Sequence, residues 1–281
     1  MRLIVAVAVV SAVALAAANP PKPFAIQNIS LSQYEDGPNL PSGQSYAAGE
    51  SIFFSFQLTG YKSEGEDEQS VRLVWQIEAK DPSGVPIFEP RTGKIATGVA
   101  SEDKNWMPKI RTVIEIPPLA PPGTYQIVMV AKDEVANAEV RKETSFTVRG
   151  TKIDPSPTLV IRDLNLYRGE EDKDPASPAV FHPGDAVWVK LYITGYKYAE
   201  KNRFEVGYGI TVLRPNGEPT LSNPEAAVEK DESFYPRPYV PAMLSLNLPK
   251  DVQKGQFTVV ISAVDKVGGQ KYEAKTAFTV E

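Results

Sequence analysis

The sequence predicts an all-β protein: two tandem antiparallel β-sandwich domains of about seven strands each, preceded by an N-terminal signal peptide. Three observations lead to this prediction. The second half of the chain repeats the first, apolar residues alternate with a period of two, and turn-forming residues are frequent, with 25 Pro and 19 Gly among 281 residues. Such alternation indicates strands with one buried face, and frequent Pro and Gly indicate many turns.

The repeat is collinear and spans most of both halves. Thr-Gly-Tyr-Lys at 59–62 recurs unchanged at 194–197, and Phe-Thr-Val at 146–148 recurs at 278–280. Other matched residues lie 132 to 135 positions apart: Gly49 with Gly184, Gly123 with Gly255, and Asp133 with Asp265. We therefore assign a first domain to residues 19–149, a linker stiffened by two prolines to 150–158, and a second domain to 159–281.

Alternating runs place the strands. Apolar residues occupy every second position of one strand in each copy: Ile52, Phe54, Phe56 and Leu58, and then Val187, Val189, Leu191 and Ile193. We expect strands to begin near 24, 51, 71, 85, 110, 124 and 139, and again near 159, 186, 206, 218, 241, 256 and 270. No stretch predicts a long helix, although residues 225–231 are compatible with one helical turn. Short strands separated by frequent turns predict a two-sheet sandwich.

The last third of each domain resembles a known fold family. Residues 119–125 read Leu-Ala-Pro-Pro-Gly-Thr-Tyr and precede an alternating strand and Phe-Thr-Val, and the second copy echoes this from Leu248 through Phe257 to residues 278–280. These segments resemble bacterial immunoglobulin-like and fibronectin type III-like domains, although the cysteine pair of true immunoglobulin domains is absent. The resemblance implies a sandwich fold, a role in binding or spacing, and a tyrosine corner at Tyr125 that Phe257 lacks the hydroxyl to form. It transfers no site.

The N-terminus predicts export. Arg2 precedes an apolar run that continues to residue 18, and Ala16 and Ala18 supply the small residues that favour cleavage before Asn19. We therefore expect a signal peptide at 1–18, a periplasmic or secreted protein, and no membrane span after cleavage. The alternative is an uncleaved anchor, for which the apolar run is short.

Composition excludes several kinds of chemistry. The chain has no Cys, one His and a formal net charge of −5. Disulfides, thiolate metal sites, a cysteine nucleophile and a site with several histidines are therefore excluded, and the acidic balance argues against a nucleic-acid partner. His182 falls in an expected loop with no nucleophile motif beside it. We expect no enzyme and no cofactor, and an enzyme built on His182 is the least favoured alternative.

Two acidic clusters, at 64–68 and 170–174, stand out. Calcium prefers clustered oxygen ligands in loops, but neither cluster has the spacing of an EF-hand. Charged, solvated loops are the simpler interpretation. The weak calcium candidates are Glu170, Glu171, Asp172 and Asp174.

Aromatic residues are concentrated in the second domain. Trp188 and Tyr192 alternate out of phase with the apolar positions of their strand, which predicts that they face outward. Residues 234–239 read Phe-Tyr-Pro-Arg-Pro-Tyr, a combination typical of interface anchors. The alternative is that the loops fold back and bury these rings. The candidate interaction surface comprises Trp188, Tyr192, Tyr198, Phe234, Tyr235, Arg237 and Tyr239.

The function expected from these features is a non-catalytic interaction or spacer module of the bacterial cell envelope or exterior. Its partner would be another envelope or extracellular protein. The alternative partner is a glycan, for which Tyr198, Tyr235 and Tyr239 should form a coplanar, exposed platform. The repeated Thr-Gly-Tyr-Lys is interpreted as structural, with Gly60 and Gly195 in a left-handed backbone conformation and the tyrosine hydroxyls in water.

Overall fold

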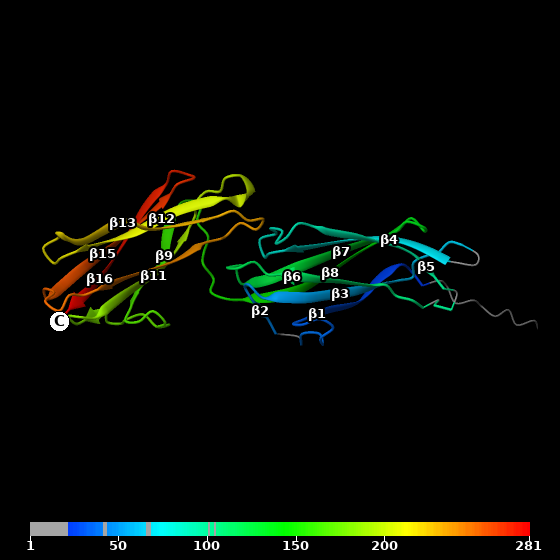
Figure 1. Ribbon diagram of the computed structural model, residues 1–281, viewed down its shortest axis with the longest axis horizontal. Helices are drawn as coiled ribbons and strands as arrows, with labels where there is room; N and C mark the ends of the chain where they lie inside the picture. Colours follow the sequence, from blue (N-terminus) through cyan, green and yellow to red (C-terminus); the bar gives the residue numbers. More distant parts are fainter. Residues whose placement is uncertain (1–21, 42–43, 66–68, 101, 104) are drawn as a thin grey trace, which may run out of the picture.

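The computed structural model describes residues 22–41, 44–65, 69–100, 102–103 and 105–281. Over these ranges the chain forms two largely antiparallel β-sandwiches that lie end to end, the first drawn in blue to green and the second in green to red (Figure 1). The expected all-β fold class is confirmed. The expected signal peptide at 1–18 lies outside the described residues and stays a prediction.

The first sandwich is built from two facing sheets. In the described part of the chain their strand orders are β1-β3-β6 and β2-β8-β7-β4-β5. Neighbouring strands are antiparallel, except that the two-residue β2 pairs in parallel with β8. The elements are β1 (Ala25–Ser32), β2 (Tyr46–Ala47), β3 (Ser51–Thr59), β4 (Gln69–Lys80), β5 (Arg91–Val99), β6 (Lys109–Glu115), β7 (Gly123–Asp133) and β8 (Ala138–Arg149).

The second sandwich repeats this topology. Its described sheets have the orders β14-β11-β9 and β10-β16-β15-β12-β13, with the two-residue β10 again parallel to its neighbour. The elements are β9 (Val160–Tyr167), β10 (Val180–Phe181), β11 (Ala186–Thr194), the short 3₁₀ helix η1 (Glu200–Asn202), β12 (Phe204–Leu213), β13 (Pro219–Asp231), β14 (Val240–Asn247), β15 (Gly255–Asp265) and β16 (Lys271–Val280).

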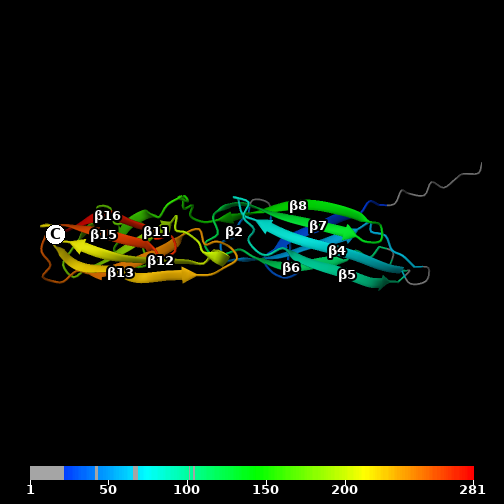
Figure 2. The same cartoon turned by 90° about the horizontal axis from the view of Figure 1, so that it is seen from above.

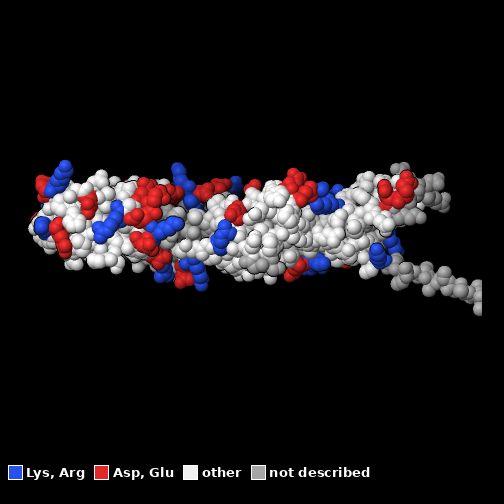
Figure 3. Space-filling view, turned by 90° about the horizontal axis from the view of Figure 1, so that it is seen from below, with Lys and Arg blue, Asp and Glu red and all other residues white. Residues whose placement is uncertain are grey.

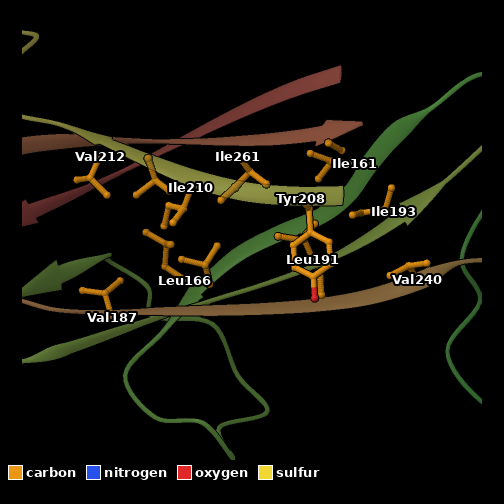
Figure 4. Packing of buried hydrophobic residues seen from close by; sticks show 14 of the residues in the cluster. Ile161, Leu166, Val187, Leu191, Ile193, Tyr208, Ile210, Val212, Val240 and Ile261 are labelled. Carbon is orange, nitrogen blue, oxygen red and sulfur yellow. The ribbon is translucent and has the colours of Figure 1, made fainter. Parts of the chain in front are cut away.

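Each sandwich has its own apolar core between the two sheets. The alternating residues predicted for β3 and β11 are all buried, from Ile52 to Leu58 and from Val187 to Ile193. In the second sandwich Leu191 from one sheet faces Tyr208 and Ile261 from the other (Figure 4). Removing this apolar surface from water is the main term that stabilises a chain without disulfides.

One predicted strand begins later than expected. We expected a strand near residue 85, but β5 starts at Arg91. Val85 instead closes a turn, accepting a 2.9 Å hydrogen bond from the Asp81 N–H, and the Ile87 N–H donates to Ala79. Val85 and Ile87 gave a strand-like apolar pattern in the sequence because this turn packs its apolar side chains against the core.

Residues 225–231, which are compatible with one helical turn in the sequence, form part of a strand instead. These residues belong to β13, where Ala227 pairs with Tyr208 and Val228 with Gly207 of β12. Pairing along β12 outweighs the helical preference of Glu, Ala and Lys, because intrinsic propensity is weak beside a long ladder of hydrogen bonds.

The molecule is elongated. A view from above shows both sandwiches in line, with the C-terminus at the outer end of the second (Figure 2). On the face seen from below, acidic and basic side chains are interspersed and form no broad basic surface (Figure 3). None of the helices in the described ranges has the length and apolar character needed to cross a membrane.

Candidate functional site at the joint between the sandwiches

The loop between β13 and β14 carries most of the predicted interaction residues, and it reaches the first sandwich (Figure 1). Pro236 and Pro238 restrict its backbone and donate no hydrogen bonds. Side chains hold its carbonyls in place: Asn202 Nδ2 donates to Phe234 at 2.5 Å, and Ser233 Oγ donates to Tyr235 at 2.8 Å. The loop is thus presented as a fixed projection from the second sandwich.

Tyr235 reaches across the joint from the second sandwich to the first. Its side chain is 7% exposed and belongs to the buried apolar cluster of the first sandwich. Its hydroxyl donates a 2.8 Å hydrogen bond to Oδ2 of Asp81. A residue predicted to meet an external partner therefore contacts the other half of the same chain.

Hydrogen bonds within its own turn fix the orientation of the Asp81 carboxylate. It follows β4, is 7% exposed, and uses Oδ1 to accept the N–H groups of Ser83 and Val85, each at 2.8 Å. The second carboxylate oxygen is left to accept the Tyr235 hydroxyl. One buried carboxylate thus fixes a turn of the first sandwich and the loop of the second.

The surroundings of Tyr235 combine apolar side chains with the charged Arg91 and Glu115. A hollow of about 480 Å³ beside the ring is lined by residues that include Ile87, Phe88, Pro117 and Pro118. Just beyond, the Tyr125 hydroxyl donates a 2.8 Å hydrogen bond to the Pro121 carbonyl. The tyrosine corner expected at Tyr125 is therefore confirmed, and it holds the proline-rich segment that forms part of this wall.

Burial controls the ionisation of the tyrosines at the joint. Desolvation raises the pKa of Tyr235 far above its usual value, and the hydrogen bond to Asp81 and the charge of that carboxylate add to the shift. Desolvation likewise raises the pKa of Tyr125, with Asp81 contributing. Both hydroxyls are consequently neutral hydrogen-bond donors at physiological pH.

The base of the loop is fixed by a second group of contacts. The hydroxyls of Tyr196 and Tyr198 both donate to the Arg237 carbonyl, the first at 2.6 Å. The Arg237 guanidinium lies over the Phe204 ring and 3.6 Å from the Glu229 carboxylate. Arg237 and Tyr198 therefore position the loop through contacts within the second sandwich.

The repeated Thr-Gly-Tyr-Lys begins next to these contacts. Gly60 and Gly195 have φ of 72° and 80°, as expected, and a Cβ at Gly195 would lie 1.9 Å from the Thr158 carbonyl oxygen. The expectation that both tyrosine hydroxyls lie in water is wrong for Tyr196, which is buried and donates to Arg237, while Tyr61 donates to the Trp106 carbonyl at 2.6 Å.

A buried aspartate in each sandwich explains why the motif recurs. Asp133 and Asp265 are both fully buried, and each accepts the backbone N–H of the lysine in the motif, Lys62 at 2.8 Å and Lys197 at 3.0 Å. The other carboxylate oxygen of each accepts two N–H groups of the next turn. The repeat pairs the two aspartates, and each lies two positions after a buried alanine, Ala131 or Ala263, so the period of two already places them on the buried face.

The remaining predicted residues lie elsewhere. Trp188 and Tyr192 occupy half-buried, outward positions of β11, and Tyr239 meets Tyr192 edge-on, with ring centres 5.3 Å apart. On the same side of β11, between Trp188 and Tyr192, Lys190 places its amine 4.6 Å from the centre of the Tyr167 ring. We call Tyr167, Trp188, Lys190, Tyr192 and Tyr239 the outer aromatic face. Phe234 is 47% exposed beside the joint.

The calcium candidates form no assembled site. Asp172 Oδ2 accepts the Gly169 N–H at 2.9 Å, and its carbonyl accepts the Lys190 amine at 2.7 Å. Glu170, Glu171 and Asp174 are exposed. No group of three or more His, Asp or Glu that could hold a metal ion lies in the described ranges, and part of the first acidic cluster, residues 66–68, falls outside them.

His182 lies in an exposed loop. Its Nδ1 is 3.6 Å from the Asp185 carboxylate, which also accepts the His182 backbone N–H at 2.7 Å. The contact is typical of an aspartate that stabilises a turn.

Comparison of the sequence with models of known protein families gives no match, and comparison with curated proteins gives none either.

Proposed function

We propose that this protein is an exported, non-catalytic structural and interaction module whose two sandwiches act as one rigid rod. The observation that carries the proposal is the insertion of Tyr235 into the apolar cluster of the first sandwich, with its hydroxyl on Asp81. A spacer must hold its ends at a fixed separation and angle, and this contact supplies the constraint that a linker alone lacks.

Rigidity is supported on both sides of the joint. On the side of the first sandwich, Asp81 is fixed by two backbone N–H groups, and Pro117 and Pro118 line the wall. On the side of the second, the carbonyl of Arg237 receives two tyrosine hydroxyls. Tyrosine adds little conformational entropy cost to such a contact, because it has two side-chain torsions.

Within this proposal the sandwiches are immunoglobulin-like or fibronectin type III-like. Two features support the assignment. Successive strands β3 and β4 belong to different sheets in a sandwich of seven longer strands and the two-residue β2. Tyr125 also makes the tyrosine corner that these folds use. The signal-like sequence at the N-terminus supports export to the periplasm or exterior.

The outer aromatic face is the surface we propose for an envelope or extracellular protein partner. It combines rings and a cation on a rigid strand, which suits an interface anchor. A glycan platform has no comparable support. Tyr235 is buried, and the Tyr192–Tyr239 and Tyr196–Tyr198 ring pairs meet at 83° and 66° rather than lying coplanar.

Capture of partners from an envelope extract tests the interaction role. The bait is the mature chain expected from the sequence, residues 19–281, and a second bait carries Trp188→Ser and Tyr192→Ser. A matched control carries Tyr272→Ser, which alters a 38% exposed ring on β16 in the other sheet. We expect a specific protein to be retained by the native and control baits and lost from the double variant. Equal capture by all three baits would contradict the assignment of this face.

A further inference from the structure

Each sandwich has one long strand at the edge of its larger sheet. In the described part of the chain β5 pairs with β4 alone, and β13 pairs with β12 alone. The two strands hold the same place in the repeated topology and run along the same long margin of the molecule (Figure 2). A strand edge presents unpaired N–H and C=O groups that can bind another strand, so proteins commonly block it.

The edge of the second sandwich is blocked. β13 contains Pro219 and Pro224, which have no N–H to donate. Its register with β12 is irregular at two places, between Tyr208 and Ile210 and between Val212 and Leu213. Proline and bulges are the usual devices against edge-to-edge association.

The edge of the first sandwich carries neither device. β5 contains no proline, and its register with β4 is uninterrupted from Gln69 opposite Val99 to Ile77 opposite Arg91. Eight of its nine residues are exposed or half-buried, and only Val99 is buried. The exposed alternate positions hold the small residues Thr92, Ala96 and Gly98, together with Lys94. Gly93 leaves room for the Trp75 ring of β4, because a Cβ there would lie 2.3 Å from that ring. β5 is therefore a regular, accessible edge.

We propose that β5 pairs with β5 of a second copy of this chain, antiparallel and centred on Ile95. In this register Lys94 lies opposite Ala96 of the partner, and Arg91 lies opposite Val99. No two like charges face each other, and the Arg91 guanidinium is already held by Thr112 and the Val113 carbonyl of β6. The strand is thus compatible with its own antiparallel copy, which is what a two-fold interface requires.

Pairing in this way joins the two larger sheets into one continuous sheet. Because β5 runs along the long axis (Figure 2), the two-fold axis places the rods antiparallel. The first sandwiches overlap, and the second sandwiches project at opposite ends. Arg91 of β5 also lines the hollow beside Tyr235, but Lys94 and Ala96 do not, and no residue of the outer aromatic face lies on β5. Variants at Lys94 and Ala96 therefore test the dimer separately from the proposed function.

Sedimentation velocity over a concentration series tests the proposal on residues 19–281. Ala96 is exposed, and Ala96→Lys would place a lysine opposite Lys94 twice in the symmetric interface. We expect the native chain to dimerise and this variant to weaken the dimer by about 2- to 30-fold, from two like-charge cross-strand pairs. Adding Lys94→Glu to Ala96→Lys converts both pairs to opposite charges and should restore the dimer.

Two controls separate pairing from misfolding. Thr220→Lys adds the same charge to an exposed position of β13 and should leave dimerisation unchanged. Because Ala96 also lies opposite Arg72 of β4, circular dichroism checks that each variant stays folded. A native chain that is monomeric at every soluble concentration would overturn the proposal. So would a dimer that Ala96→Lys does not weaken, or one that Lys94→Glu fails to restore.

Discussion

The Tyr235 hydroxyl donates a 2.8 Å hydrogen bond to the Asp81 carboxylate, across 154 positions of sequence and from one sandwich to the other. Asp81 is an ordinary turn residue of the first sandwich, and Tyr235 stands in a loop of the second. In the proposed rigid rod, this contact joins the two domains in addition to the linker. The proposed rigidity therefore depends on a small number of side chains at the joint, which the following predictions test.

Loss of the Tyr235 hydroxyl should weaken the joint. Tyr235→Phe removes a hydrogen bond to a buried carboxylate and should destabilise the joined state by about 1.5–3 kcal/mol, whereas Tyr235→Ala also removes the ring and should cost about 3–5 kcal/mol. Differential scanning calorimetry measures the effect. We expect the transition that includes the contact between the sandwiches to move to lower temperature in both variants. Phe234→Ala, at the exposed neighbouring position, is the matched control and should change little.

Alkaline pH should loosen the joint. Burial raises the pKa of Tyr235 in the folded state above the usual tyrosine value of 10.0. Its contribution to stability is therefore complete below pH 10 and is lost as pH rises above 10 towards the folded-state pKa. Small-angle scattering between pH 7 and pH 11 should therefore show the rod becoming flexible at the alkaline end. Because Tyr125 and Tyr196 also have raised pKa values, Tyr235→Phe is measured in parallel. An identical pH profile for both proteins would contradict the role of Tyr235.

Glycine at the repeated motif should be required for space as well as for backbone conformation. Gly195 and Gly217 both have positive φ, but a Cβ at Gly195 would overlap the Thr158 carbonyl, while nothing lies within 4 Å of one at Gly217. Gly217→Ala should cost about 1–2 kcal/mol, the strain of a left-handed backbone alone. Gly195→Ala should cost clearly more in urea unfolding. Equal costs would show that the close approach to Thr158 is not limiting.

Buried aspartates should stabilise each sandwich separately. The two carboxylate oxygens of Asp265 accept four hydrogen bonds. Asp265→Asn replaces one of these oxygens with an NH₂ group, which cannot accept, so donors such as the Lys197 N–H lose their acceptor. We expect a loss of about 1–3 kcal/mol or more. Amide hydrogen exchange should accelerate at Lys197 and Gly268 but not at Lys62 of the first sandwich. Uniform acceleration in both sandwiches would contradict independent roles.

Much of the fold was predictable because it depends on local pattern. The alternation in β3 and β11 specifies the buried face, and the left-handed glycines and the Tyr125 corner follow from short motifs. The failures have physical causes. Residues 225–231 prefer a helix in isolation but pair with β12, and Val85 and Ile87 are apolar because a turn packs on the core.

The candidate site was only partly predictable. Composition marked the loop at 234–239 as a surface for an external partner, but the Tyr235 ring is buried within the chain, as in the alternative interpretation. Its partner is the first sandwich, because alternation reports which face of a strand is buried and not which body covers a loop. Asp81 looks like a turn residue in the sequence, and its second oxygen is recruited through a contact made only in three dimensions.

Rigidity of the rod is tested most directly by a distance between the two sandwiches. Because the chain has no Cys, Glu139→Cys on β8 and Lys275→Cys on β16 give two unique, exposed sites for spin labels. Double electron–electron resonance, with the labelled protein diluted in unlabelled protein, should give one narrow distance distribution that broadens when Tyr235→Ala is added. A broad distribution in the native chain, or one that Tyr235→Ala leaves unchanged, would contradict the account.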